Sequence, residues 1–378
     1  MCSFVPLRLT CEDQIIWENL KPSSTLLCRP FFFKFAHENK LGIKEEKANI
    51  DAEIEKLEPS LMGNNIRVKH SMLMTMIDGK IASQLSGTST QKCDICKAVP
   101  SEMNKLEIIS KKPISTEFYQ YGLSSLHAWI RSMECLLHIA YRLDFQKWQA
   151  KDEICKEALK NRKKTIQQKF REEMGLLVDI VKQGSGTSND GNTARKFFED
   201  PEKTAEITNL NPELIRRLGT ILKVISCGEP VNTEAFANFT NQTAQMYVEL
   251  YGWYYMPSSV HKILMHGAEI IKHFGILPIG KLSEEAPEAR NKDFRKIRED
   301  HTRKFNRIAS NEDIFHGFLL SSDPYISSIR PVLRKSKKRE VSHDMEPLLL
   351  IDKQDKENIE FVDMSMIESD LEDDDILS

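Results

Sequence analysis

Two short stretches, Cys93-Asp-Ile-Cys96 and His261-Lys-Ile-Leu-Met-His266, decide how this chain is expected to fold. Two thiols and two imidazoles at these internal spacings are the ligand types of a tetrahedral zinc site. Cys96 and His261 lie 165 positions apart, which is far more than a zinc finger spans. A metal held by all four side chains would therefore close one large domain and act as a structural clamp.

Each half of this pattern also has a plainer interpretation. The Cys pair alone is equally typical of a redox or free thiol pair, and the two His residues could be unrelated to it. Residues five apart do not share a face of an ideal helix, because five residues rotate the chain by about 500°. We therefore expect one of the two His residues to lie where a helix starts, ends or bends, which Pro257 and Gly267 allow.

The composition predicts a mostly globular chain with separated charges. Its 378 residues are 40% hydrophobic and 29% charged, which suits two or three domains, or one large domain with an insertion. The net charge is −3, yet residues 160–171 and 334–339 are basic and the last ten residues are strongly acidic. Such segregation favours contact with nucleic acid, although a solvated helix face explains much of it equally well.

The eight cysteines indicate a reducing compartment. The chain has no signal-peptide pattern and no apolar run near the ~20 residues of a membrane span, so no membrane partner is expected. We interpret the Cys93–Cys96 pair as a metal or redox pair, and the other six cysteines as buried or free thiols. The run RKSKKR at 334–339 matches a nuclear localisation signal, which predicts the nucleus.

The order of predicted elements is strand, strand, helix, strand, followed by a long helical region. Strands are expected within 5–11, 30–35 and 66–78, the last of them apolar and ending at Asp78, and an amphipathic helix over 39–57. Helices are expected across 117–180, 211–225, 233–251 and 283–308, with a flexible loop at 184–192. Residues 335–378 lose periodicity and predict a disordered tail.

Two acids bracket the Cys and His pairs. Asp78 is followed by Gly79, so its carboxylate can project from a strand end, while Glu288 lies early in a helix with Lys292 and Arg295 further along the same stripe. Acids that share Mg²⁺ or Mn²⁺ beside cations are the essentials of two-metal phosphodiester chemistry. The plainer interpretation is a turn at Asp78 and an ordinary surface position for Glu288.

Four segments in this order resemble a known family. They are FVPLRLTCEDQIIWENLKPSSTLLCRPFFFKF (4–35), MTMIDGKIASQLSGTSTQKCDICKAVPSEMN (74–104), HKILMHGAEIIKHFG (261–275) and SEEAPEARNKDFRKIREDHTRKFNR (283–307). Together they are similar to the catalytic core of Transib DNA transposases and to the related large recombinase subunit of vertebrate V(D)J recombination. The resemblance extends over about residues 5–330 with the segments in family order.

The resemblance implies an α+β fold, in which a partial RNase H-like sheet is interrupted by a long, mainly helical insertion clamped by zinc. Its domains would be a partial RNase H-like core at 1–90, the helical insertion with the split zinc site at 91–278, and C-terminal helices completing the core at 279–331. A basic and then acidic tail would follow at 332–378.

The resemblance also implies roles for individual residues. Asp78 would be the second acid and Glu288 the third acid of an Asp-Asp-Glu triad that holds Mg²⁺ or Mn²⁺. Asn192 and Arg195 match a segment that lies near transposon-end DNA, and Lys292 and Arg295 would contact DNA beside Glu288. The zinc ligands would be Cys93, Cys96, His261 and His266. His127, in LSSLHAWI, matches a family helix start and on its own reads as a core histidine.

One departure from the family bears on activity. The first Asp of the triad belongs upstream of the segment that begins here at residue 5, so that strand and its Asp are expected to be missing. Asp13, in the turn CEDQ, is a poor substitute. Loss of a metal ligand lowers such rates by orders of magnitude. We therefore expect a transposase remnant whose ancestral nicking, hairpin formation and strand transfer are absent from this chain alone.

Another class of function stays open. A non-catalytic, zinc-stabilised protein derived from the transposase could bind DNA or a partner through the basic stretch KNRKKTIQQKFR (160–171). The acidic end could also be a docking peptide for a basic partner. The expected partners are double-stranded DNA and, by resemblance only, a second copy of the chain or a full-length relative.

Overall fold

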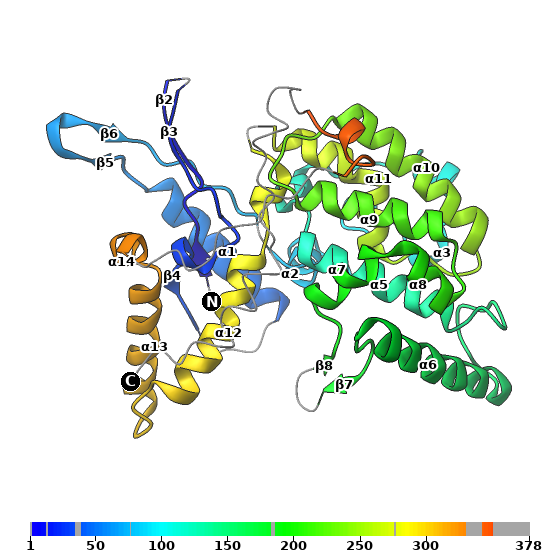
Figure 1. The fold of residues 1–378 in the computed structure, drawn as a ribbon. Helices are drawn as coiled ribbons and strands as arrows, with labels where there is room; N and C mark the ends of the chain where they lie inside the picture. The colour runs from blue at the N-terminus through cyan, green and yellow to red at the C-terminus, as the bar shows by residue number, and fades with distance from the viewer. Residues whose placement is uncertain are drawn as a thin grey trace.

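The computed structural model describes residues 2–12, 14–34, 39–75, 77–182, 186–275, 277–329 and 342–350 (Figure 1). The protein is of the α+β class and is mainly helical with small antiparallel sheets. The N-terminal strands lie on one side in Figure 1, and the larger group of helices around α5, α9, α10 and α11 lies on the other. We call this group the helical module; it comprises residues 91–273.

The strands of the described residues form four separate two-stranded antiparallel sheets. The strands expected within 5–11 and 30–35 are confirmed as β2 and β4. The larger RNase H-like sheet implied by the resemblance is not assembled among the described residues. The pairs are β1 (Cys2–Phe4) with β4 (Arg29–Phe32), β2 (Arg8–Cys11) with β3 (Gln14–Glu18), β5 (Ser60–Leu61) with β6 (Arg67–Val68), and β7 (Val181–Lys182) with β8 (Gly186–Thr187).

The long strand predicted over residues 66–78 is wrong. Only β6 forms there, and the described residues after it have no regular structure until Asp78 caps the next helix, α2 (Gly79–Leu85). An apolar run forms a long strand only when neighbouring strands satisfy its backbone groups, and β6 has the two-residue β5 as its neighbour. Asp78 therefore begins a helix and does not end a strand.

Several predicted helices are confirmed close to their expected ends. They are α1 (Lys40–Glu55), α9 (Pro212–Ser226) and α10 (Thr233–Tyr251). The two His residues lie on a further helix, α11 (Ser258–His273), for which the sequence predicts no bounds. In α1, α9 and α10 an Asn side chain accepts a hydrogen bond from a backbone N–H of the first turn. Asn39, Asn211 and Asn232 thereby satisfy a donor that the helix itself leaves free, which fixes each start.

The helical prediction for 117–180 is right for two segments and wrong between them. The segments are α5 (Ser125–Ala140) and α6 (Glu153–Met174), and residues 141–152 form turns. The break has a local cause, because Gln146 has a positive φ of 48° and Asp152 caps α6 through the N–H of Cys155. α6 ends at Gly175, whose φ of 65° suits a glycine.

The last predicted helix, over 283–308, is also two helices. α12 (Glu285–Asp300) ends before Asn306, which caps α13 (Arg307–Ser321), and α14 (Pro324–Ile329) follows. These three helices return to the N-terminal strands, since α13 packs on β4 (Figure 1). The other helices are α3 (Pro100–Met103), α4 (Leu106–Ile109), α7 (Gly191–Glu199), α8 (Pro201–Thr208), η1 (Thr25–Leu27), η2 (Gly63–Asn65), η3 (Thr116–Tyr121), η4 (Ile279–Leu282) and η5 (Glu346–Leu348).

Part of the predicted disordered tail is ordered. Residues 342–350 pack against the helical module, and Met345, Leu348 and Leu349 are buried in its core. The backbone N–H of Asn232 donates to the carbonyl of Leu348, and an antiparallel bridge joins Leu349 to the residue before Asn232. The expectation was wrong here because a short apolar run carries no periodicity. The rest of the predicted tail lies outside the described residues.

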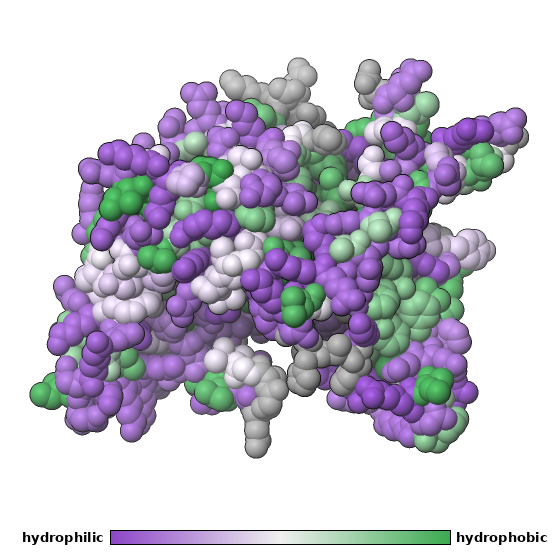
Figure 2. All heavy atoms as spheres, turned by 180° about the vertical axis from the view of Figure 1, so that it is seen from behind, coloured by the Kyte–Doolittle hydropathy of each residue, from purple (hydrophilic) through white to green (hydrophobic). Residues whose placement is uncertain are grey.

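Apolar side chains are exposed on the N-terminal hairpins. Ile15, Ile16 and Leu61 are 53%, 58% and 71% exposed, and the hairpins β2–β3 and β5–β6 project from the body of the protein (Figure 1). Most of the face shown in Figure 2 is hydrophilic, with apolar side chains in small separate spots. A two-stranded hairpin has no second layer to bury its apolar residues, which explains their exposure.

Candidate metal centre

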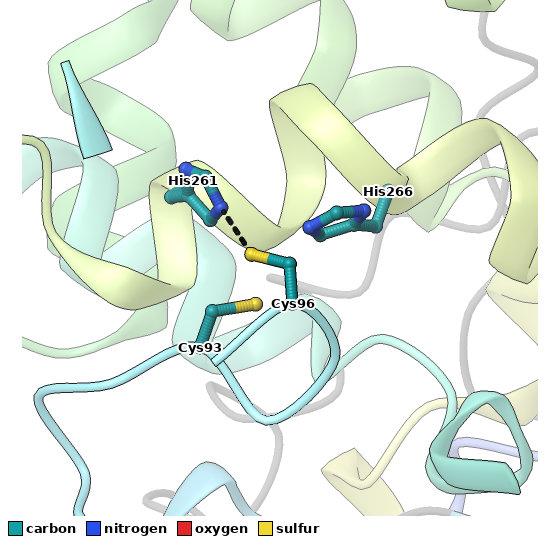
Figure 3. Close-up of side chains that lie close together, drawn as sticks. All are labelled: Cys93, Cys96, His261 and His266. Carbon is teal, nitrogen blue, oxygen red and sulfur yellow. Dashed lines mark hydrogen bonds between the residues drawn. The ribbon is translucent and has the colours of Figure 1, made fainter. Parts of the chain in front are cut away.

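Four buried side chains from two distant segments meet at one point. Cys93 and Cys96 come from the loop between α2 and α3, and His261 and His266 come from α11 (Figure 3). One ligand atom from each residue lies within 4.8 Å of all the others, and no side chain is more than 5% exposed. Among the described residues, no other group of three or more His, Cys, Asp or Glu side chains meets this criterion. The group predicted from the spacing therefore assembles and could hold a metal ion.

The loop that presents the thiols is closed by its own backbone. The N–H of Cys93 donates to the carbonyl of Ala98, and the N–H of Lys97 donates to the carbonyl of Cys93. Lys97 has a φ of 58°, in the left-handed region, which turns the chain back after Cys96. This tight loop directs both sulfur atoms towards α11 (Figure 3).

The two imidazoles reach the same point from one continuous helix. His261 lies in the first turn of α11 and His266 lies further along it. Of the three places expected for one His, a helix start, end or bend, the structure shows the start. Their ring centroids are 5.4 Å apart, and Nε2 of His261 lies 3.3 Å from Sγ of Cys96. The rings are inclined at 72° and converge on the thiols from two directions (Figure 3).

The polar atoms of the group fit a bound cation. Nε2 of His266 is buried and has no hydrogen-bond partner among the described residues. A buried nitrogen without a partner is costly unless something else satisfies it, and a metal ion would do so. The thiol of Cys96 is also prepared for metal, because a hydrogen bond with Cys93 lowers the pKa of Cys96 to about 7. The same hydrogen bond, and then burial, raise the pKa of Cys93.

Contacts outside the group hold the same two segments together. Asp94, between the two cysteines, accepts a hydrogen bond at 3.0 Å from Nζ of Lys262, which follows His261. The side chains are 8% and 16% exposed, so water screens this ion pair weakly. Oγ of Ser258, at the start of α11, donates to the carbonyl of Thr90. Two cysteines and two histidines without an open position suit a structural zinc ion.

The candidate acids do not form a second metal group of this kind. Asp78 is half-buried, and its Oδ1 accepts the N–H of Ile81 at 2.7 Å as the cap of α2. Glu288 lies in the first turn of α12, as the sequence predicts, but its side chain is exposed and accepts a hydrogen bond from Asn291. Asp13 lies outside the described residues.

A polar cluster that the sequence did not predict lies at the start of α5. Oε1 of Glu284 accepts hydrogen bonds from Oγ of Ser124, from the backbone N–H of His127 at 3.3 Å and from Nδ1 of His127 at 3.2 Å. The hydrogen bond to Glu284 is the largest cause of a raised pKa for His127, and the charge of Asp78 adds to it. Glu284 therefore lies in the same region of the protein as Asp78, one helical turn before Glu288.

This cluster is not a nucleophilic triad. In such a triad the serine and the acid contact opposite nitrogens of the imidazole, so that a proton can pass between them. Here Ser124 and Glu284 both contact Nδ1 of His127. The signal that could have found the cluster is the pair of acids at 284–285, where α12 begins, but a sequence does not tell which of two adjacent acids is buried.

The four predicted DNA-contact residues lie on α7 and α12. Asn192 and Arg195 are half-buried on α7, whereas Lys292 and Arg295 are exposed on α12. Arg195 forms an ion pair at 2.6 Å with Glu285 and lies 5.9 Å from the ring centroid of Trp129. In this arrangement Arg195 joins α7 to the start of α12.

No protein-family model matches the chain, and no curated protein sequence matches it. Among the described residues, no helix is long and apolar enough to cross a membrane. The inference about function therefore depends on the site and on the resemblance of the four segments.

Proposed function

We propose that this chain is a remnant of a Transib-like DNA recombinase core, in which a zinc-clamped helical module holds duplex DNA. The observation that carries the proposal is the buried group of Cys93, Cys96, His261 and His266, whose members lie far apart in the sequence and meet at one point. The resemblance implies this ligand set in this order. A group formed by chance would have no reason to assemble across α11 and a loop 165 positions away.

Helix α6 supplies a surface suited to the DNA backbone. Lys160, Lys164 and Arg171 are exposed and lie within 40° of one another around the helix, so they form one stripe. None of the three has an ion-pair partner among the described residues. Cations arranged along a helix contact phosphates without reading sequence, and they give binding that weakens as salt displaces them.

The proposed chemistry would use Asp78 and Glu288. In the family's reaction, Mg²⁺ or Mn²⁺ held by carboxylates activates the attacking oxygen and stabilises the leaving oxygen. Asp78 would present the carboxylate oxygen that does not cap α2, and Glu288 would present its exposed carboxylate. Among the described residues Asp78 and Glu288 belong to no group of three or more potential metal ligands, so we propose that this chain alone does not nick DNA.

A binding assay with terminal-repeat and unrelated duplexes tests the proposal. We expect binding to both at low salt, with a logarithmic affinity that falls steeply against the logarithm of salt concentration. Replacing Lys160, Lys164 and Arg171 by Gln should make this dependence shallower, while Lys44→Gln on α1 serves as the control. Binding that does not change with salt, or no binding at low salt, would contradict the DNA-binding proposal.

A nicking assay in Mn²⁺ tests the inactivity separately. We expect no nicked product from a terminal-repeat duplex. Product that appears with the unaltered chain and disappears with Asp78→Ala would overturn this part of the proposal and leave the DNA-binding part intact.

A second candidate is a non-catalytic, zinc-stabilised protein that binds DNA or a protein partner. The environment of Glu288 favours this candidate. Its side chain is exposed and accepts a hydrogen bond from Asn291, as an ordinary surface carboxylate does without any catalytic role. Mn²⁺ binding distinguishes the two: in the recombinase remnant Glu288→Gln weakens it, whereas in the second candidate it has no effect.

A further inference from the structure

The start of α5 gathers three hydrogen-bond donors onto one oxygen atom. They are the hydroxyl of Ser124, the backbone N–H of His127 and Nδ1 of its imidazole, and all three contact Oε1 of Glu284. The acceptor comes from the residue just before α12, 157 positions away from His127. A backbone N–H at a helix start, a hydroxyl and an imidazole are the donors that proteins offer to oxyanions.

Only one of the two carboxylate oxygens of Glu284 has hydrogen-bond partners in the described part of this arrangement. The residue is 3% exposed, and its second oxygen, Oε2, is buried without a hydrogen-bond partner among the described residues. A buried carboxylate oxygen that has lost its water and gained no donor is unfavourable. Glu284 is therefore bound through one oxygen, while its other oxygen gains no hydrogen bond from the described residues.

We propose that Ser124 and His127 at the start of α5 form a binding site for a DNA phosphate, which Glu284 fills from within the chain until DNA displaces it. This proposal rests on the proposed function, because the DNA that the protein is proposed to bind supplies the phosphate. A phosphodiester carries one negative charge shared by its two non-bridging oxygens, so one of these oxygens can occupy the position of Oε1. Glu284 acts as a competing anion and weakens the binding of DNA.

The charges around the site support an anion that can be exchanged. α5 has 16 residues, and its aligned backbone dipoles favour negative charge at its start. His127 is 33% exposed at its side chain, and its pKa is raised chiefly by the hydrogen bond to Glu284, so it carries positive charge more readily than a free histidine. Arg131, one turn along α5, is a cation that is 56% exposed, and it forms an ion pair at 2.7 Å with Glu134.

One neighbouring charge opposes a phosphate. The carboxylate of Asp78 acts on His127, and it would repel a DNA phosphate at this site. A divalent cation bound at Asp78 would remove this repulsion. Phosphate binding at the start of α5 should therefore strengthen in Mg²⁺, and Asp78→Asn should strengthen it without Mg²⁺.

Removal of the competing anion tests the proposal. Glu284→Gln keeps the shape and removes the charge, whereas Glu284→Ala empties the position. We expect both variants to bind a short duplex about tenfold more tightly than the unaltered chain, measured by fluorescence anisotropy at fixed salt. Glu299→Gln is the control, because it removes the same charge from an exposed position near the far end of α12.

Two further measurements test whether a gain in duplex affinity comes from this site. In Glu284→Ala, inorganic phosphate should shift the NMR signal of the His127 amide, and the shift should be smaller when Ser124 is also replaced by Ala. The unaltered chain should show no shift at the same phosphate concentration. Zinc content and thermal unfolding of each variant establish that the helical module is intact.

Three outcomes would overturn the proposal. The first is an equal gain in duplex affinity in Glu284→Gln and Glu299→Gln. The second is a gain in Glu284→Ala that stays the same when Ser124 is also replaced by Ala. The third is no response of the His127 amide to phosphate in a folded Glu284→Ala chain. The phosphate titration needs no DNA. It therefore separates a failure of this site from a failure of duplex binding as such, which would instead appear as no binding by the unaltered chain at low salt.

Discussion

At the scale of single residues, buried polar side chains mark where distant segments meet. Arg290 on α12 is 1% exposed, and its guanidinium donates to the carbonyls of Cys28 and Thr25 and to Oγ of Ser321. It also forms an ion pair at 2.8 Å with Asp293. A buried guanidinium is tolerated because partners satisfy its several N–H groups. Arg290 thereby fixes α12 beside the N-terminal strands, two residues after Glu288.

The pair of His127 and Glu284 should make stability depend on pH. The pKa of His127 is raised in the folded protein above its ordinary value of 6.5, chiefly by Glu284. Its contribution is therefore complete below about pH 6.5 and is lost as the pH rises through the higher folded value. We expect the free energy of unfolding, measured by urea denaturation, to fall across this interval.

The variant His127→Gln isolates this contribution. It keeps a side chain that can donate to Glu284 but does not titrate, so its unfolding free energy should change less between pH 6 and pH 8. His70→Gln is a suitable control, since His70 contacts Ser60 on an exposed hairpin. Identical pH profiles for the unaltered chain and for His127→Gln would show that the ion pair contributes nothing measurable.

At the scale of elements, helix α12 connects two parts of the chain. The chain at its start joins the helical module, because Ser283, two residues before α12, contacts Ser125, and Glu285 pairs with Arg195. The approach to α12 is equally constrained at η4: a Cβ atom on Gly280 would lie 1.9 Å from the carbonyl oxygen of Cys227. Only glycine fits this approach between backbones, so the position of α12 is set before the helix begins.

The packed segment 342–350 should contribute to stability. Leu348 is 3% exposed and packs at α10, whereas Leu350 is 60% exposed only two residues later. We expect Leu348→Ala to lower the free energy of unfolding by about 2–5 kcal/mol, because it removes buried methyl groups and leaves a cavity. Leu350→Ala should change it by less than about 0.5 kcal/mol. Equal effects of the two substitutions in urea denaturation would contradict the docking of this segment.

At the scale of the whole molecule, the Cys93, Cys96, His261 and His266 group closes the longest connection in the helical module. Bringing two segments 165 positions apart to one point costs conformational entropy on folding, and contacts or a bound metal must offset this cost. The ion pair of Asp94 and Lys262 and the buried core contribute part of this. Zinc bound to four protein ligands supplies folding free energy directly.

Loss of one ligand should remove both zinc and cooperative folding. We expect about one zinc ion per unaltered chain by elemental analysis, and none in Cys93→Ser, whose helical module should unfold at a lower temperature in circular dichroism. Cys11→Ser is the matched control, because Cys11 is exposed and does not belong to the group. A well-folded, unaltered preparation that contains no zinc would disprove the zinc assignment.

The residues of the metal group could be predicted because metal binding depends on the types of the ligand residues and on their spacing in the sequence. The limits of α1, α9 and α10 could also be predicted, since capping Asn side chains and helical periodicity act over a few residues. The strand over 66–78 could not, because strand formation depends on neighbours that are not adjacent in sequence. The same holds for residues 342–350, whose order comes from a surface more than a hundred positions away.

The sequence by itself therefore determined which side chains can bind metal, where most helices begin and which segments carry charge. The tertiary structure decided which of these residues meet. It brought Cys93 and Cys96 to α11, buried Glu284 and left Glu288 exposed, and placed Glu284 against Ser124 and His127. The physical reason is that burial and long-range hydrogen bonds depend on how elements pack, whereas capping and ligand spacing are local properties of the chain.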